Sequence, residues 1–145
     1  MTRLLMPLLN PPRRLRVLAL ILFAALAANL FYHGAQPYAV GLIPPPWDKL
    51  AHLIVFGGFA GLTWVALGGV SLANWLAPLA AVVVGLADEF WQGFHPGRSV
   101  DVKDVVADLV GGLLVVLVLA WLRRSVVRRQ GLGRASAGPG EPAIR

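Results

Sequence analysis

The longest uncharged stretch of the chain limits its fold most strongly. Residues 50–87, the 38 positions between Lys49 and Asp88, contain no Asp, Glu, Lys or Arg. One helix of that length would be about 57 Å long, almost twice the hydrocarbon thickness of a bilayer. The segment Gly-Gly-Val-Ser at residues 68–71 predicts a break, because glycines end helices and Ser71 can cap the next one. The stretch therefore predicts two membrane-spanning helices joined by a tight turn.

Two further apolar segments bring the number of predicted spans to four. The chain is 57% hydrophobic and 14% charged, whereas a soluble domain usually carries about 25% charged residues. The predicted spans are Val17–Tyr32, Leu50–Gly68, Leu72–Phe94 and Val102–Leu122. Pro78 is expected to bend the third span near its start. The fold class predicted is all-α, an integral membrane bundle of four transmembrane helices.

Arginines before the first span and after the last one set the expected orientation. Because positive charge marks cytoplasmic ends, both termini are predicted to be cytoplasmic, and the segments at 33–47 and 95–101 to lie outside. The net charge of +6 can also indicate nucleic acid. The arginines flank apolar spans, however, so no nucleic-acid partner is expected. The predicted divisions are a basic cytoplasmic N-terminus (1–16), a transmembrane domain (17–122) and a basic disordered cytoplasmic tail (123–145).

The first span has an alternative interpretation as a cleavable signal peptide. Arg14 and Arg16 precede an apolar run, and residues 25–27 (Ala-Leu-Ala) resemble a cleavage site. The run continues to Phe31, which favours a retained helix. Cleavage would leave three crossings and would not change which face holds the polar residues described next.

Nearly all the acidic residues fall at the predicted outer ends of three helices. The polar residues follow helical spacing. Asp48 and His52 are four residues apart, and Asp104 and Asp108 lie on one stripe of the fourth helix. A carboxylate within an apolar helix costs a few kcal/mol unless it is partnered, so a functional cluster is favoured over a purely structural one. The candidate binding residues are Asp48, His52, Asp88, Glu89, Gln92, Arg98, Asp101, Asp104 and Asp108.

Several of these residues also have simple structural interpretations. Asp48 follows three prolines and a tryptophan and can cap a helix. Asp101 and Asp104 can form an acidic first turn favoured by the helix dipole. Lys49 is interpreted as an ordinary interfacial anchor, and Arg98 as a charge that neutralises neighbouring acids.

Together these residues carry a resemblance to a known family. Asp48-Lys49-x-x-His52, Glu89-x-x-Gln92 and Pro96-Gly97-Arg98, followed by Asp101 and Asp104, resemble the VanZ-like membrane protein family over about residues 47–119. Asp108 departs from the pattern, because many members have Asn there. The family is named for an accessory factor in teicoplanin resistance. The resemblance therefore implies the inner (cytoplasmic) membrane of a bacterial cell envelope and suggests a role in antibiotic resistance, but it implies no settled biochemical activity.

Three functions stay open at this stage. In the first, the outer pocket binds a lipid-linked or glycopeptide headgroup, with Arg98 on its phosphate or carboxylate and membrane lipids as further partners. In the second, the chain is a membrane hydrolase or transferase. Its catalytic candidates are Glu89 and Asp104 as acid and base, and His52. In the third, the polar network only holds a structural subunit together.

The sequence leaves several properties undetermined. No metal site is predicted, because the spacing matches no metal signature, although carboxylates with His52 can in principle hold a divalent cation. An ion pathway is disfavoured, because the inner halves of the spans offer only Thr63, Ser71 and Asn74 as polar groups. Whether the chain is an enzyme, its cofactor, its ligand and its oligomeric state stay open.

Overall fold

A computed structural model describes the backbone of residues 2–136 and the side chains of residues 6–129. Within this part of the chain the structure is all-helical. The helices are α1 (Thr2–Leu9), α2 (Arg13–Gly34), α3 (Trp47–Ala66), α4 (Ala73–Gln92) and α5 (Val102–Ser136), with a short 3-10 turn, η1 (Pro37–Ala39). Four of them are long and apolar enough to cross a membrane: α2, α3, α4 and α5, the last over Val102–Arg129. The all-α membrane bundle predicted from hydropathy is confirmed.

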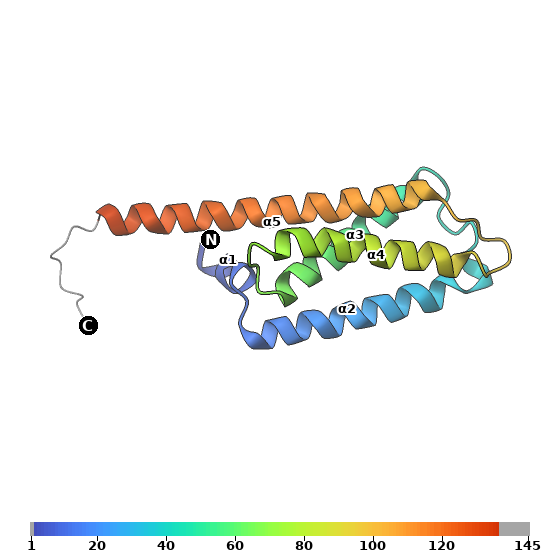
Figure 1. The fold of residues 1–145 in the computed structure, drawn as a ribbon, viewed down its shortest axis with the longest axis horizontal. Coiled ribbons are helices and arrows are strands. Elements are labelled where there is room, and N and C mark those ends of the chain that lie inside the picture. The colour runs from blue at the N-terminus through green and yellow to red at the C-terminus, as the bar shows by residue number, and fades with distance from the viewer. Residues whose placement is uncertain (1, 137–145) are drawn as a thin grey trace.

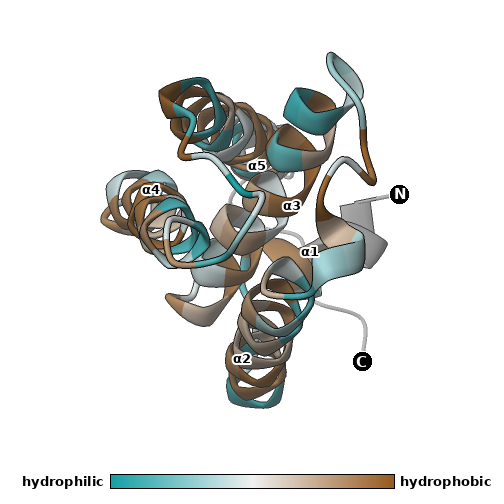
Figure 2. Ribbon diagram, turned by 90° about the vertical axis from the view of Figure 1, so that its right-hand side faces the viewer, coloured by the Kyte–Doolittle hydropathy of each residue, from teal (hydrophilic) through white to brown (hydrophobic). Residues whose placement is uncertain are grey.

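The four long helices run side by side, and their connections lie at two opposite ends. In Figure 1, α1, the start of α2 and the red end of α5 lie at one end. The segment carrying η1 and the segment joining α4 to α5 lie at the other. Figure 2 looks onto this second end and shows hydrophilic residues on the near turns of α3 and α5. The polar ends of helices distant in sequence therefore meet at one end of the bundle.

The turn between α3 and α4 forms where the glycines predicted it. Gly68 and Gly69 have φ angles of 80° and 64°, in the left-handed region that favours glycine. The Gly68 N–H donates to the Val65 carbonyl and the Gly69 N–H to the Trp64 carbonyl, which closes the C-terminus of α3. The predicted Ser71 cap is wrong, since α4 has no side-chain cap and the Ser71 carbonyl accepts from Asn74 N–H instead.

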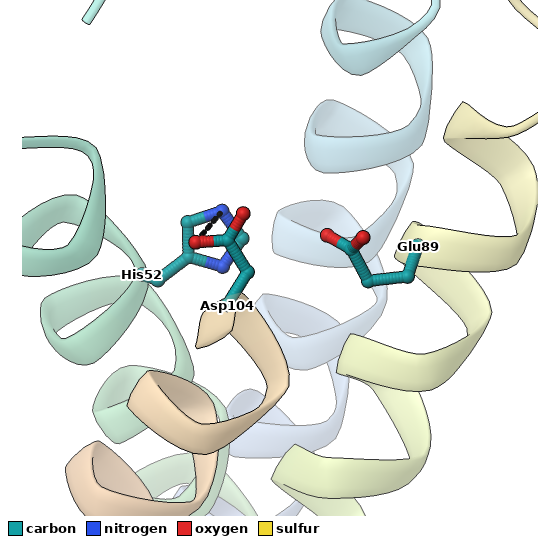
Figure 3. Close-up of side chains that lie close together, drawn as sticks. All are labelled: His52, Glu89 and Asp104. Atoms are coloured by element: carbon teal, nitrogen blue, oxygen red, sulfur yellow. Dashed lines mark ion pairs between the residues drawn. The ribbon is translucent and has the colours of Figure 1, made fainter. Parts of the chain in front are cut away.

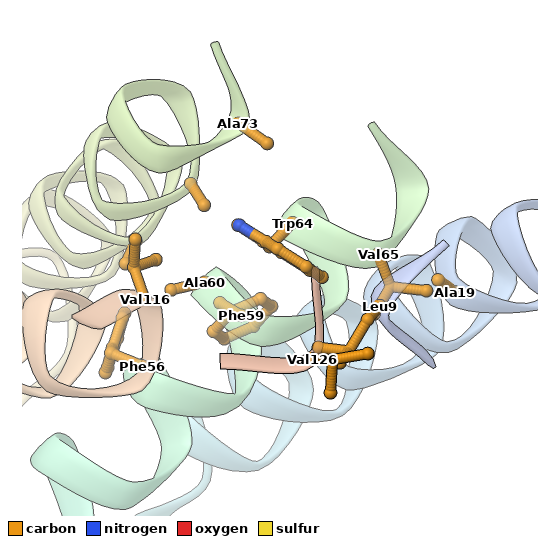
Figure 4. Packing of buried hydrophobic residues seen from close by; sticks show 12 residues of the cluster. Leu9, Ala19, Phe56, Phe59, Ala60, Trp64, Val65, Ala73, Val116 and Val126 are labelled. Carbon is orange, nitrogen blue, oxygen red and sulfur yellow. The ribbon is translucent and has the colours of Figure 1, made fainter. Parts of the chain in front are cut away.

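The core is formed by large aromatic side chains of α3 and small residues of its neighbours. Phe56, Phe59 and Trp64 are almost completely buried (Figure 4). The Trp64 indole N–H donates to the Asn74 side-chain oxygen at 2.9 Å, which satisfies the buried donor. Phe23 of α2 meets Phe59 edge to face with ring centroids 5.0 Å apart. These contacts seat α2 and α4 against α3.

Glycines set the distance between α3 and α5. A Cβ atom on Gly57 would lie 3.2 Å from the Gly111 carbonyl oxygen, and one on Gly111 would strike the backbone of Leu53. One on Gly112 would lie 3.3 Å from the Cα atom of Pro78. The absence of side chains at these positions lets the helix backbones touch. Gly57, Gly111 and Gly112 therefore let α3, α4 and α5 pack closely within this chain.

The predicted helix boundaries need three corrections. α2 begins at Arg13, not Val17, directly after Pro11 and Pro12, because proline suits the start of a helix. Part of the predicted N-terminal segment is itself helical, as α1. α5 does not end at Leu122.

The prediction of a disordered tail from residue 123 is wrong as far as residue 136. α5 continues through Ser136, and Val126 is buried in the same apolar cluster as Leu9 of α1 (Figure 4). Arginine, valine and glutamine side chains are compatible with helix, and the contact with α1 gives this extension an apolar face. Residues 137–145 of the predicted tail lie outside the described residues.

Candidate functional site

A pocket of about 610 Å³ opens at the end of the bundle that holds η1. Its lining comes from all four long helices and from the segments that join α2 to α3 and α4 to α5. Seven of the nine predicted binding residues line it: Asp48, His52, Asp88, Gln92, Arg98, Asp101 and Asp104. The other two, Glu89 and Asp108, are buried beside it, with 3% and 0% of their surface exposed.

Lys49 is the cation that joins α3 to the start of α5. Its Nζ atom lies 2.5 Å from Asp104 Oδ1, 2.7 Å from Asp101 Oδ2 and 3.1 Å from Asp48 Oδ2. The interpretation of Lys49 as an ordinary interfacial anchor is therefore wrong. Instead, one ammonium group compensates three carboxylates that would otherwise repel one another.

Asp101 connects three elements at the entrance to α5. Its carboxylate accepts from the Lys103 backbone N–H at 2.8 Å, and its own N–H donates to Glu89 Oε2 at 2.6 Å. The first of these bonds caps α5, a role that the sequence analysis did not assign to Asp101. The hydrogen bond from the Lys49 ammonium, supported by that of the Lys103 N–H, lowers the pKa of the Asp101 carboxyl below its usual 3.8.

His52 is fixed in orientation by α5 and by its own helix. Its Nδ1 atom lies 2.9 Å from Oδ1 of the buried Asp108. The imidazole ring stacks on Phe56, with centroids 5.4 Å apart and planes inclined by 8°. Asp108 in turn occupies space that only a glycine at position 85 leaves open, since a Cβ atom there would strike Asp108 Oδ2. These contacts turn the Nε2 atom of His52 toward Asp104, whose Oδ1 lies 3.8 Å away.

Glu89 and Asp88 each keep one buried carboxylate oxygen without a hydrogen bond among the described residues. Asp88 Oδ2 accepts from the Gln92 side-chain amide at 2.7 Å, while its Oδ1 has no such partner. Glu89 Oε2 accepts from Asp101 N–H, while its Oε1 has none. Buried acceptors are normally satisfied, so these two atoms mark places where a ligand, an ion or water belongs.

The three residues proposed as catalytic candidates converge. One ligand atom each from His52, Glu89 and Asp104 lies within 4.8 Å of the others. Figure 3 shows the Glu89 carboxylate extending from α4 toward the His52 ring on α3 and the Asp104 carboxylate on α5. The sequence analysis placed residues 52, 89 and 104 at the same end of the bundle, but no local spacing could show that their side chains meet.

Arg98 enters the pocket without forming an ion pair within the described part of the chain. Its Nη1 atom donates to the Ala39 carbonyl at 3.3 Å, and its buried Nε has no partner there. Any compensation of the neighbouring acids by Arg98 therefore acts without a direct ion pair. Arg98 and Asp88 both approach Gly34, since a Cβ atom there would lie 3.8 Å from Arg98 Nη2 and 3.6 Å from Asp88 Oδ1.

Sequence reasoning missed the contribution of the segment between α2 and α3. Residues 38–43 line the pocket, together with His33 at the end of α2. The His33 ring nitrogen hydrogen-bonds the Tyr38 hydroxyl, which ties this segment to α2. No motif marked it, because Tyr38 has the only polar side chain among residues 38–43.

The family model described as VanZ/LLP1 matches residues 4–123. The chain belongs to the VanZ/LLP1 family. The match includes every residue of the pocket lining, and it extends the resemblance, first placed on residues 47–119, to α1 and α2. Searches of the curated proteins and of the solved structures gave no match. The chain is thus a VanZ-like membrane protein, and most of the residues that carry the family resemblance line its pocket.

Proposed function

We propose that this VanZ-like protein binds the anionic headgroup of a lipid-linked or glycopeptide molecule at the outer face of a bacterial inner membrane. The observation that carries the proposal is the guanidinium group of Arg98 in the pocket. Among the described residues it has one hydrogen bond, to a carbonyl, and no carboxylate within 4.0 Å. A planar guanidinium with free donors binds phosphate or carboxylate in a two-pronged manner.

The arginine distribution supports placing the pocket outside the cell. Arginines gather at the end of the bundle opposite the pocket, at the start of α2 and along the last turns of α5: Arg13, Arg14, Arg16, Arg123, Arg124, Arg128 and Arg129. Positive charge is retained on the cytoplasmic side. A fluorescent reporter fused after Arg145 is expected to fold in the cytoplasm, and a periplasmic reporter at that position to be inactive. The reverse result would contradict the orientation.

The pocket suits a headgroup in size and in chemistry. Its volume of about 610 Å³ lies within the range of roughly 300–1,000 Å³ typical of ligand sites. Arg98 supplies the positive charge for an anionic group. Asp48 and Asp101, at the rim, can accept hydrogen bonds from sugar hydroxyls or amines of the same headgroup.

The proposal is tested by mass spectrometry of molecules that copurify with the chain. Wild type, Arg98→Ala and Arg98→Lys are compared, with Lys103→Ala as control, because Lys103 is an exposed cation at the same end that does not line the pocket. We expect a bound anionic molecule in wild type and control, and at least a tenfold loss with Arg98→Ala. Equal occupancy in all four would contradict the proposal. Loss of the Arg98 variants from the membrane would favour the purely structural role instead.

The resistance link is tested separately. Expression in a teicoplanin-susceptible bacterium is expected to raise the inhibitory concentration, and Arg98→Ala to abolish the increase while abundance stays unchanged. If the Arg98→Ala variant raises the inhibitory concentration as much as the wild type does, resistance does not depend on the pocket.

A membrane hydrolase or transferase is the second candidate, favoured by the convergence of His52, Glu89 and Asp104. Under this reading, Glu89→Gln retains the bound molecule but stops its conversion, which mass spectrometry of the ligand before and after incubation would show. If the wild type leaves the ligand chemically unchanged, the hydrolase or transferase function is contradicted and binding is the only function supported.

A further inference from the structure

We propose that His52, Glu89 and Asp104 form a binding site for one divalent transition-metal ion, of the Zn²⁺ or Mn²⁺ class. The site goes beyond headgroup binding and does not depend on it. One imidazole nitrogen and two carboxylate oxygens are ligands that these ions accept.

The spacing of the three ligand atoms is close to that of a formed site. They lie within 4.8 Å of one another. Ligands about 2.1 Å from a metal ion are about 3.4 Å apart in a tetrahedron and at most about 4.2 Å apart on opposite sides. Small rotations of the two carboxylates would bring the three ligand atoms to these separations, and no helix would need to move.

His52 is prepared to act as a ligand. Metal-binding histidines commonly donate the N–H of the second ring nitrogen to a carboxylate, which fixes the ring and makes the free nitrogen more basic. Here Nδ1 is 2.9 Å from Asp108 Oδ1, and Phe56 stacks against the ring. Nε2 is left on the side of Asp104. A helix-capping cluster of acids would not require a histidine held in this way.

Glu89 supplies an independent observation in favour of a bound cation. Its side chain is 3% exposed, and Oε1 has no hydrogen-bond partner among the described residues. The carboxylate is directed into the space between His52 and Asp104 (Figure 3). A buried carboxylate oxygen without a partner is costly, and a metal ion in this position would satisfy it.

The surrounding charges favour a cation and leave it accessible. Six carboxyl groups at this end are accompanied by two cations in the pocket lining, Lys49 and Arg98. When Asp104 binds the ion, Lys49 keeps its contacts with Asp48 and Asp101. His52 and Asp104 line the pocket and Glu89 approaches from behind, so the remaining coordination positions face the pocket. Three protein ligands with open positions are typical of metal sites that bind water or substrate.

The test uses the tag-free chain in lipid nanodiscs, stripped with a chelator and titrated with Zn²⁺ or Mn²⁺ alone. We expect one ion per chain and a rise in melting temperature that the chelator reverses. Glu89→Gln keeps an acceptor for the Asp101 N–H but loses the charge, so its affinity is expected to fall more than tenfold. His95→Gln is the matched control, because His95 lies at the same end and contacts the Trp91 carbonyl. It should bind as wild type does.

Spectroscopy keeps the proposal testable if Glu89→Gln fails to fold. Bound Mn²⁺ should show coupling to one imidazole nitrogen, and this signal should vanish in His52→Gln but persist in Arg98→Ala. Persistence in Arg98→Ala separates metal binding from headgroup binding. Absence of saturable binding in the wild type, or equal affinity in wild type and Glu89→Gln, would overturn the proposal.

Discussion

His52 Nδ1 on α3 and Asp108 Oδ1 on α5 lie 2.9 Å apart, although 56 positions separate the residues in the sequence. Asp108 is completely buried and the His52 ring is half-buried. The pair therefore couples the position of the imidazole to the packing of α5 on α3. The imidazole also lies between two carboxylates of α5, because its Nε2 atom faces Asp104.

Replacing Asp108 by asparagine tests what its charge contributes. Asn has nearly the same shape and keeps an acceptor for the His52 N–H, so the free energy of unfolding is expected to change by less than about 1 kcal/mol. The metal affinity should fall by about 10–100-fold, as expected for the loss of a supporting carboxylate. Thermal melting and Zn²⁺ titration measure the two effects. Unchanged affinity would show that Asp108 serves packing alone.

Gly111→Ala tests the close approach of α3 and α5. The added methyl group would strike the Leu53 backbone, which cannot rotate away, so we expect a loss of about 1–3 kcal/mol in the free energy of unfolding. Gly58→Ala is the control, because its nearest neighbour is a Leu26 methyl at 3.8 Å. Alanine favours helix there by up to about 1 kcal/mol. Equal melting temperatures for the two variants would contradict the tight contact.

Lys49→Met removes the cation shared by three carboxylates. The carboxylates would then repel one another, and we expect a loss of about 1–3 kcal/mol in the free energy of unfolding, limited by their partial exposure to solvent. The exposed Lys103 contacts Asp101 through its backbone, so Lys103→Met should change stability by less than about 0.5 kcal/mol. Equal effects of the two substitutions would mean that the ion pairs of Lys49 contribute nothing measurable.

The titration of Asp101 gives a pH-dependent readout of the same contact. Its pKa lies below the usual 3.8, chiefly because the Lys49 ammonium donates to the carboxylate. A carboxyl with a lowered pKa in the folded state stabilises the fold above its unfolded pKa, and this stabilisation is lost as the pH falls through the folded pKa. The loss should therefore occur below about pH 4. NMR of the Asp101 carboxyl should show its pKa rising in Lys49→Met, and an unchanged value would contradict this assignment.

Most of the fold could be predicted because its main signals are local. The four spans follow from apolar length, and the turn at Gly68 and Gly69 follows from residues that tolerate positive φ. The predicted start of α2 and the predicted end of α5 were wrong. The contact that accompanies the extension of α5, between Leu9 and Val126, joins opposite ends of the sequence and leaves no local pattern.

The candidate site was predictable as a set of residues but not as an arrangement. Helical spacing grouped the acids at one depth, and seven of the nine candidates line the pocket. The central position of Lys49 was missed, because a lysine at a helix end usually reaches solvent. The lining from residues 38–43 was missed because apolar residues there carry no chemical signature.

The sequence alone determined how many helices are long and apolar enough to cross a membrane and near which helix end each polar group lies. Both follow from a fixed rise per residue and a fixed hydrocarbon thickness. Only the tertiary structure decided which groups face one another, since this depends on how each helix is rotated about its own axis. Here the contact of Gly111 with Leu53 sets that rotation for α5 and brings Asp104 and Asp108 to His52.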